Sequence, residues 1–269
     1  MSFNVTAEAY DGFMGVWSQH LAPQLADFGG VRPGQRVLDV GCGPGSLTNE
    51  LVARLGPKAV SAVDPSEPFV AAARTRYPGV DVRQAQAEAL PYPDARFDAA
   101  LAQLVVHFMA DPVAGIREMA RVTRPGGAVV ACVWDYAGGR GPLGPFWEAA
   151  RAFDPNVDDE STLAGTRQGH LVELVEAAGL TGVDEGVLSS ERDYDGFDAW
   201  WEPFTRGVGP AGTFLARLAP EQQVDLRERC RRMLPDGPFV LTAHAWAARG
   251  LVMAGAKAIV GTPSIDGPR

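Results

Sequence analysis

Short apolar runs alternate with longer amphipathic stretches through the first half of the chain. The runs are rich in Val, Leu and Ala at consecutive positions, which is typical of strands buried on both faces. They predict strands over 37–40, 59–63, 80–83, 97–104 and 128–134. Apolar residues at helical spacing between them predict helices over 46–55, 65–77 and 111–122. Strands that alternate with helices through short links must pair in parallel with right-handed crossovers, so the pattern predicts an α/β fold.

This regular alternation ends after residue 135. Alternating apolar and polar positions over 183–192 and 237–250 predict two late strands, which we expect to form an antiparallel pair at the sheet edge. The segments 136–182 and 193–236 contain aromatic residues at helical spacing and predict a helical cap inserted after the fifth strand. Residues 251–269 are small and polar, and predict a loose tail.

A glycine-rich loop joins the first predicted strand to the first helix. Residues 36–46 read RVLDVGCGPGS, with Gly41, Gly43 and Gly45 at alternate positions and Asp39 just before them. Glycine accepts positive φ and has no Cβ, so such a loop can turn sharply out of a sheet and let a ligand lie against bare backbone. Strand, glycine turn and helix form the first half of a nucleotide-binding βαβ unit.

The spacing of the glycines separates two classes of nucleotide site. A dinucleotide fingerprint, G-x-G-x-x-G, would need its third glycine at residue 46, where Ser46 stands. A second carboxylate, Asp64, follows the next strand about 20 residues beyond the loop, where it can accept hydrogen bonds from both hydroxyls of a ribose. Asp39 or Asp64 alone could be only a turn residue, but the pair at this spacing argues against that reading.

This arrangement resembles motif I of the class I S-adenosylmethionine (SAM) dependent methyltransferases, particularly the methyltransferase type 11 group that includes ubiquinone and menaquinone methyltransferases. The resemblance extends over residues 36–134 and includes the Leu-Pro pair at 90–91 and the Arg-Pro-Gly-Gly turn at 124–127. It implies a Rossmann-like, seven-stranded, mostly parallel sheet with helices on both faces, in which residues 31–135 form the SAM-binding core.

The resemblance also implies roles for individual residues toward SAM. SAM carries no phosphate, so the glycines would serve close approach of its methionine and ribose. In the related group an Asp accepts a hydrogen bond from the adenine amino group; Gln86 stands at that place, and its neutral carbonyl can still accept this bond. Ala87 would offer its backbone N–H to an adenine ring nitrogen. The cofactor-binding residues expected are Tyr10, Asp39, Gly41, Gly43, Gly45, Asp64, Pro65, Gln86, Ala87 and Gln103.

Residues 1–30 are expected to form N-terminal lid helices. Tyr10, Phe13, Met14 and Trp17 are three or four positions apart, as on one face of a helix. Packing against the core would explain this stripe. The resemblance offers an alternative, because small-molecule methyltransferases often carry an N-terminal Tyr-Asp helix that closes over the cofactor. Tyr10 followed by Asp11 fits that pattern, so Tyr10 is the candidate lid residue.

Two polar residues, Gln103 and His107, lie at the end of the fourth predicted strand and just after it. Ligands of open α/β sheets bind outside the carboxyl ends of the strands, at the switch point between the first and fourth strands. Gln103 and His107 therefore fall where cofactor would meet methyl acceptor. Histidine titrates near neutral pH, which makes His107 the candidate base for a phenol, hydroxyl or amine acceptor. A histidine satisfied by backbone at a helix start is the alternative, and an already nucleophilic acceptor needs no base.

Composition and charge exclude several function classes. With 46% hydrophobic residues the chain can bury a proper core, and its longest apolar stretch, 101–110, is far shorter than the roughly 20 residues of a membrane helix. The first residues lack the pattern of a secretory signal, so a cytoplasmic location is expected. A net charge of −9 argues against a nucleic-acid partner. Three scattered cysteines and the other potential ligands form no metal constellation.

We therefore expect a methyltransferase that moves a methyl group from SAM to an O, N or C atom of a small, apolar or aromatic metabolite, as a monomer or homodimer. The aromatic residues of the cap would form its core, line the acceptor site, or both. Two other classes stay open. A SAM-binding regulator would bind SAM without consuming it, and an NAD(P)-dependent oxidoreductase would need the glycine that Ser46 replaces.

Overall fold

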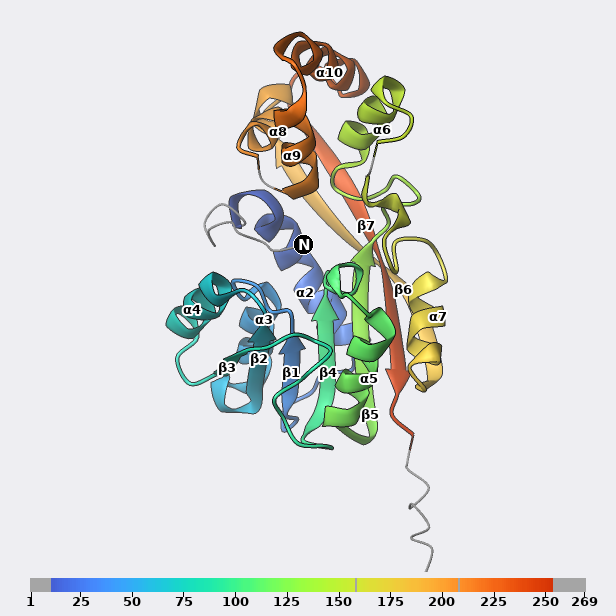
Figure 1. Ribbon diagram of the computed structural model, residues 1–269. Helices are drawn as coiled ribbons and strands as arrows, with labels where there is room; N and C mark the ends of the chain where they lie inside the picture. The colour runs from blue at the N-terminus through green and yellow to red at the C-terminus, as the bar shows by residue number, and fades with distance from the viewer. Residues whose placement is uncertain (1–10, 158, 208, 254–269) are drawn as a thin grey trace, which may run out of the picture.

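The computed structural model describes residues 11–157, 159–207 and 209–253, and within them seven strands form one sheet (Figure 1). The strand order is β3-β2-β1-β4-β5-β7-β6. Strands β1 to β5 pair in parallel, and β7 is antiparallel to both β5 and β6. The strands are β1 (Val37–Val40), β2 (Val60–Asp64), β3 (Asp81–Gln84), β4 (Phe97–Gln103), β5 (Thr123–Trp134), β6 (Thr181–Tyr194) and β7 (Phe239–Leu251). The predicted fold class is confirmed, with a single antiparallel hairpin at one end of the sheet.

Helices cover both faces of the sheet, because side chains of each central strand alternate between two hydrophobic clusters. Val37 and Leu101 pack in one cluster with α2 (Val16–Phe28) and α3 (Ser46–Leu55). Leu38 and Ala100 pack in the other with α5 (Pro112–Val122) and α7 (His170–Ala177). Helix α4 (Glu67–Arg76) packs on β2 and β3. Short helical turns are η1 (Asp11–Gly15), η2 (Pro57–Ala59), η3 (Val106–Phe108) and η4 (Glu160–Thr162).

Four further helices form a lobe beyond the carboxyl ends of the parallel strands, which we call the cap (Figure 1). They are α6 (Gly144–Phe153), α8 (Phe197–Thr205), α9 (Gly209–Arg217) and α10 (Pro220–Met233), and the long strands β6 and β7 run up to them. The cap is held by stacked aromatic rings, such as Phe146 on Phe204 with centroids 4.7 Å apart. These rings belong to the same hydrophobic cluster as the buried residues of α2 and of the sheet strands that α2 covers, so the cap and the sheet share one core.

The structure departs from the sequence-based expectations at three places. Helix α7 was grouped with the cap, but it packs against β5, β6, β7 and α5 because its buried Leu171 and Val175 face the sheet. Helix α9 was not predicted. The turn at 124–127 is a bulge inside β5, where the pairing with β4 jumps from Thr123 to Ala128.

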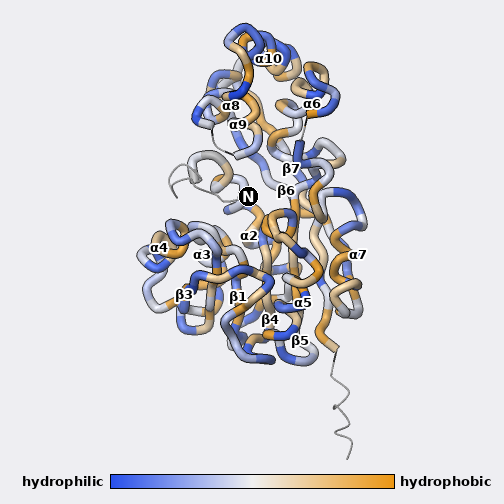
Figure 2. The backbone as a smooth tube through the Cα atoms, viewed as in Figure 1, coloured by the Kyte–Doolittle hydropathy of each residue, from blue (hydrophilic) through white to orange (hydrophobic). Residues whose placement is uncertain are grey.

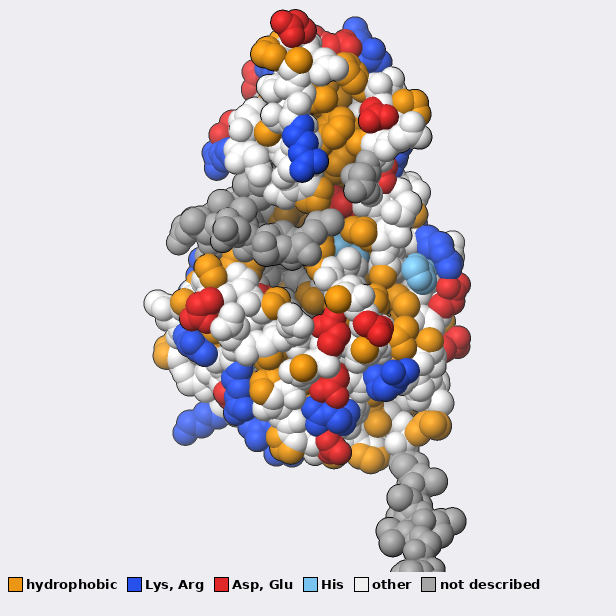
Figure 3. Space-filling model, viewed as in Figure 1, with side chains coloured by type: hydrophobic (Ala, Val, Ile, Leu, Met, Phe, Trp, Pro, Cys, Tyr) orange, Lys and Arg blue, Asp and Glu red, His pale blue; other side chains and the backbone are white. Residues whose placement is uncertain are grey.

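The hydropathy of the backbone follows these layers, with hydrophobic segments concentrated in the sheet and in the inner parts of the helices (Figure 2). Among the described residues, every helix is too short or too polar to cross a bilayer. Acidic and basic side chains are interspersed over the face of the sheet region shown in Figure 3, and hydrophobic side chains gather in a band on the cap. This face therefore presents mixed charge and not a basic surface.

Candidate functional site

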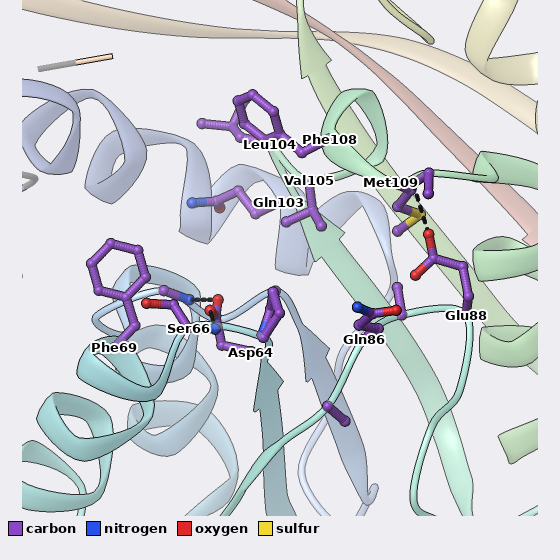
Figure 4. A pocket seen from close by; sticks show the side chains of 16 residues that line it. Asp64, Ser66, Phe69, Gln86, Glu88, Gln103, Leu104, Val105, Phe108 and Met109 are labelled. Carbon is purple, nitrogen blue, oxygen red and sulfur yellow. Dashed lines mark hydrogen bonds between the residues drawn. The ribbon is translucent and has the colours of Figure 1, made fainter. Parts of the chain in front are cut away.

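A pocket of about 400 Å³ lies at the carboxyl ends of β1, β2 and β4, where the strand order reverses (Figure 4). Its walls come from the β1–α3 loop, the start of α4, the loop 85–88 and the segment 103–110 after β4. Its size is within the usual range for small-molecule sites, and its place is the switch point at which α/β sheets bind ligands. The parallel sheet thus delivers residues from four loops to one cavity.

The three loop glycines have different reasons for lacking a side chain. All have positive φ, +69° at Gly41, +53° at Gly43 and +109° at Gly45. A Cβ on Gly41 would meet Val105 Cγ2 at 2.4 Å, and one on Gly45 would meet the ring of Tyr77 at 2.2 Å. A Cβ on Gly43 would meet no described atom within 4 Å, and Gly43 lines the pocket. Gly43 therefore presents bare backbone to a ligand, whereas Gly41 and Gly45 make room for packed side chains.

Asp64, at the end of β2, closes the glycine loop through its carboxylate. Its Oδ2 accepts the backbone N–H of Gly43 and its Oδ1 that of Ser66, both at 2.8 Å. The residue is only 6% exposed, and this burial raises the pKa of the carboxyl. Each oxygen keeps a further lone pair, so the pocket-lining carboxylate can still accept two hydroxyl donors.

Asp39 lies beneath the loop and outside the lining of this pocket. Its Oδ2 accepts the hydroxyl of Thr48 at 2.6 Å, while Oδ1 is buried without a partner among the described residues. The side chain is 1% exposed, and desolvation raises the pKa of Asp39 to about 7, with the nearby charge of Asp64 adding to the shift. Asp39 supports the loop from behind, and its contact with the cofactor stays a prediction.

Gln103 links the pocket to α2. Its Nε2 donates to the backbone carbonyl of Ser18 at 2.9 Å. Because that carbonyl can only accept, the amide orientation is determined, and Oε1 is the atom left over. Oε1 is buried and has no hydrogen-bond partner in the described part of the chain. The pocket wall therefore contains an unpaired acceptor at the end of β4.

His107 is in η3, just past the pocket segment, and does not line the cavity. Its ring packs against Phe108, 3.8 Å between centroids, and edge-on to Tyr136 at 6.0 Å. Burial lowers the pKa of His107 to about 3, so the imidazole is neutral at physiological pH. Nδ1 is buried and has no partner within residues 11–157, 159–207 and 209–253. In this closed arrangement His107 is a weak proton acceptor that an acceptor molecule reaches only if the ring becomes exposed.

The loop after β3 forms the end of the pocket farthest from Asp64 in Figure 4. Gln86 is exposed and Ala87 is buried, and both line the cavity. Glu88, which the sequence analysis missed, lines it too; its Oε1 accepts the backbone N–H of Ala110 at 2.8 Å and of Asp111 at 3.3 Å. The available signal was an acid two positions after Gln86, in the same loop after β3.

The pocket brings together most of the cofactor-binding residues predicted from the sequence. Those in its walls are Gly41, Gly43, Asp64, Pro65, Gln86, Ala87 and Gln103. Gly45 lines a separate polar cavity of about 290 Å³ on the outer side of the loop. Tyr10 lies outside the described residues.

A family model described as a methyltransferase domain matches residues 38–131. Two curated relatives are malonyl-acyl-carrier-protein O-methyltransferases. The one from Pseudescherichia vulneris is 38% identical over 128 residues, which are 48% of this chain and 50% of the relative. The one from Serratia marcescens is 30% identical over 179 residues, 64% of this chain and 69% of the relative. The chain thus spans about half the length of the first relative and more than two thirds of the second.

Solved structures share the fold. The YcgJ protein from Bacillus subtilis aligns with a TM-score of 0.57 at 20% sequence identity, over 88% of this chain and 99% of that one. At that identity the similarity shows the fold alone, and not a substrate.

Proposed function

Because the chain belongs to the class I SAM-dependent methyltransferases, we propose that it transfers a methyl group from SAM to an O, N or C atom of a small, apolar or aromatic metabolite. The observation that carries this proposal is the pocket at the switch point, where Gly43 presents bare backbone beside the partly free carboxylate of Asp64. A non-catalytic SAM-binding regulator would share the pocket, so a turnover assay is needed to distinguish the enzyme from the regulator.

The residues of the pocket fit the chemistry of SAM. The ribose hydroxyls need acceptors, which Asp64 supplies through its remaining lone pairs. The methionine ammonium needs an acceptor and a close approach, which the unpaired Oε1 of Gln103 and the backbone of Gly43 supply. The adenine needs an apolar slot with polar groups at its edge; Ala87 and Met109 line the far end of the pocket, with the polar side chains of Gln86 and Glu88 beside them.

When bound, SAM supplies a methyl group on a sulfonium, which reacts by in-line displacement. The protein's own part is to hold the acceptor in line and to exclude water. Gln103 is held in the pocket wall by the hydrogen bond that its Nε2 donates to the backbone carbonyl of Ser18. We propose His107 as the base for an acceptor that must lose a proton; this role requires that acceptor binding exposes its ring, because burial keeps the pKa of His107 at about 3.

The aromatic residues of the cap form its core: Phe146, Trp200 and Phe204 are all buried there. They would shape an acceptor site only through the residues that pack on them. Glu160 is the charged exception: burial raises the pKa of this carboxyl to about 7, and its Oε2 accepts the indole N–H of Trp147 at 3.3 Å. The raised pKa leaves Glu160 partly protonated near neutral pH, which reduces the charge inside the cap.

Calorimetric titration with SAM, with S-adenosylhomocysteine and with NAD tests the cofactor assignment. Micromolar binding of the first two without NAD binding supports the proposal, and binding of NAD alone would refute it. Turnover is then measured against phenols, quinols, amines and a malonyl thioester, the last because of the relatives' printed activity. Tight SAM binding with no turnover on any acceptor would favour the regulator. A cytoplasmic location and a monomer or homodimer stay predictions, which fractionation and light scattering would test.

A further inference from the structure

We propose that Glu88, and not Gln86, supplies the acceptor that recognises the adenine amino group of the cofactor. The inference rests on the proposed function, because it takes the pocket at the switch point as the SAM site. It goes beyond it by assigning base recognition to a residue that neither the glycine loop nor the resemblance indicates. The two side chains differ in how they are held and in which of their atoms are left without a partner.

The carboxylate of Glu88 is held in place on one side and free on the other. Oε1 accepts two backbone N–H groups, from Ala110 at 2.8 Å and Asp111 at 3.3 Å. Oε2 accepts no hydrogen bond from the part of the chain that the structure describes, although Glu88 is half-buried and lines the pocket. In Figure 4 the carboxylate lies between Gln86 and Met109, with one oxygen bonded and the other open. A donor entering this end of the pocket therefore meets a pre-positioned anionic acceptor.

The backbone that holds Glu88 is itself anchored to α5. Asp111 caps this helix by accepting the N–H of Ala114 at 2.9 Å. Met109 packs directly over Gly115, where a Cβ would approach its sulfur to 2.5 Å and Ala87 to 3.4 Å. The backbone N–H groups that position Glu88 thus lie directly before the capped first turn of α5, so Oε2 needs little reorganisation when a ligand arrives.

Gln86 is less suited to the same task. Its side chain is exposed and makes no hydrogen bond within the described residues, so binding would have to order a flexible side chain. Its carbonyl is also neutral, and hydrogen bonds to a charged acceptor are roughly twice as strong as neutral ones. Both the cost of ordering and the strength of the bond therefore favour Glu88 over Gln86.

Glu88→Gln separates recognition from support, because the two atoms of the new amide have opposite roles. Its carbonyl would continue to accept the N–H groups of Ala110 and Asp111, and its NH2 would replace Oε2 with a donor. Gln86→Leu is the matched control at the neighbouring position. The two ligands are S-adenosylhomocysteine and the analogue in which hydrogen replaces the C6 amino group, so the ratio of their dissociation constants reports the amino group alone.

We expect the wild-type protein and Gln86→Leu to prefer S-adenosylhomocysteine by roughly tenfold or more. Glu88→Gln should bring the ratio close to one, with unchanged affinity for the analogue and a melting temperature near that of the wild type. A ratio unchanged in Glu88→Gln, or lost in Gln86→Leu, would overturn the inference. Equal affinities in the wild-type protein would overturn it without any variant. If wild-type protein binds neither ligand, the proposed function itself fails, which is a distinct result.

Discussion

Replacing Gly41 and Gly43 separately by alanine should affect different properties: Gly41→Ala mainly lowers stability, and Gly43→Ala mainly weakens cofactor binding. Both glycines have left-handed backbones, with φ of +69° and +53°, so the backbone strain of an alanine is similar at the two positions. Only at Gly41 does the new methyl also collide with a packed side chain, at 2.4 Å and 2.6 Å from the two methyl carbons of Val105. At Gly43, which lines the pocket, the new methyl meets no described atom within 4 Å, so only a bound ligand would oppose it.

The difference in stability follows from the collision. Carbon atoms in contact are normally about 3.5–4.0 Å apart. Rotation of Val105 cannot relieve the overlap, because both of its methyl groups are close and a β-branched side chain has few rotamers. Left-handed strain costs each alanine variant about 1–2 kcal/mol. Overpacking adds about 1–3 kcal/mol to Gly41→Ala alone, which corresponds to a further fall in melting temperature of roughly 2–12 °C.

The assay is thermal unfolding without ligand, paired with titration of S-adenosylhomocysteine. Gly43→Ala should keep most of its stability and lose roughly 10- to 100-fold in affinity, whereas Gly41→Ala should lose more stability. The control is the double-mutant cycle with Val105→Ala, which removes both colliding methyl groups. In that background Gly41→Ala should cost only the strain energy, a coupling of about 1–3 kcal/mol. Equal melting temperatures for Gly41→Ala and Gly43→Ala, or strictly additive effects in the cycle, would refute the reasoning.

Three further predictions concern the charged and titratable groups. Asp64→Asn should weaken S-adenosylhomocysteine binding by roughly 10- to 100-fold, because it replaces a charged acceptor and opposes one backbone N–H with a donor; unchanged affinity in a folded variant would remove Asp64 from the ribose site. The pKa of Asp39 is raised from its ordinary value of 3.8 to about 7, so the folded state holds the proton more tightly than the unfolded state. This carboxyl therefore lowers stability progressively as the pH rises from about 4 through about 7. Asp39→Asn should therefore gain in melting temperature over the wild type more at pH 8 than at pH 5, and an equal gain at both would contradict the assignment. His107→Gln should lower kcat by about 100-fold with unchanged cofactor affinity; an unaltered rate from pH 5 to pH 9 would show that His107 is not the base.

The parallel core was predictable because its strands are buried on both faces and therefore apolar at consecutive positions. The same holds for several residues that line the pocket, since Asp64 and Gln103 end β2 and β4, Gly43 follows β1 closely, and parallel strands bring their carboxyl ends together. Spacing could not reveal why each glycine is there. Gly41 accommodates Val105 and Gly45 accommodates Tyr77, and these contacts join segments that are distant in the sequence.

The same limit explains why α7 was assigned to the cap and why the burial of His107 was not foreseen. Helix α7 follows the irregular segment after β5. The spacing of its apolar residues predicts a helix with one apolar face, but it does not predict which element packs against that face. His107 follows a strand end as Gln103 does, but η3 turns its ring away from the pocket, against Phe108 and Tyr136. Distance along the chain from a strand end therefore does not tell which side chains of the following helical turn reach the pocket, since Phe108 lines it and the neighbouring His107 does not.

Helix α2 connects the cofactor pocket with the cap more directly than any pattern in its own sequence indicated. Its Ser18 carbonyl holds Gln103 in the pocket wall, and its Trp17 ring lies edge-on to Trp134 at 6.3 Å, at the end of β5 that leads to the cap. On the other side, Gln24 pairs with both backbone groups of Ser189 in the edge strand β6, at 2.7 Å and 3.1 Å. A ligand that engages Oε1 of Gln103 therefore acts on a side chain whose nitrogen is already committed to α2. Because α2 is also bonded to β6, which runs up to the cap, the pocket at the switch point and the cap are joined through one helix.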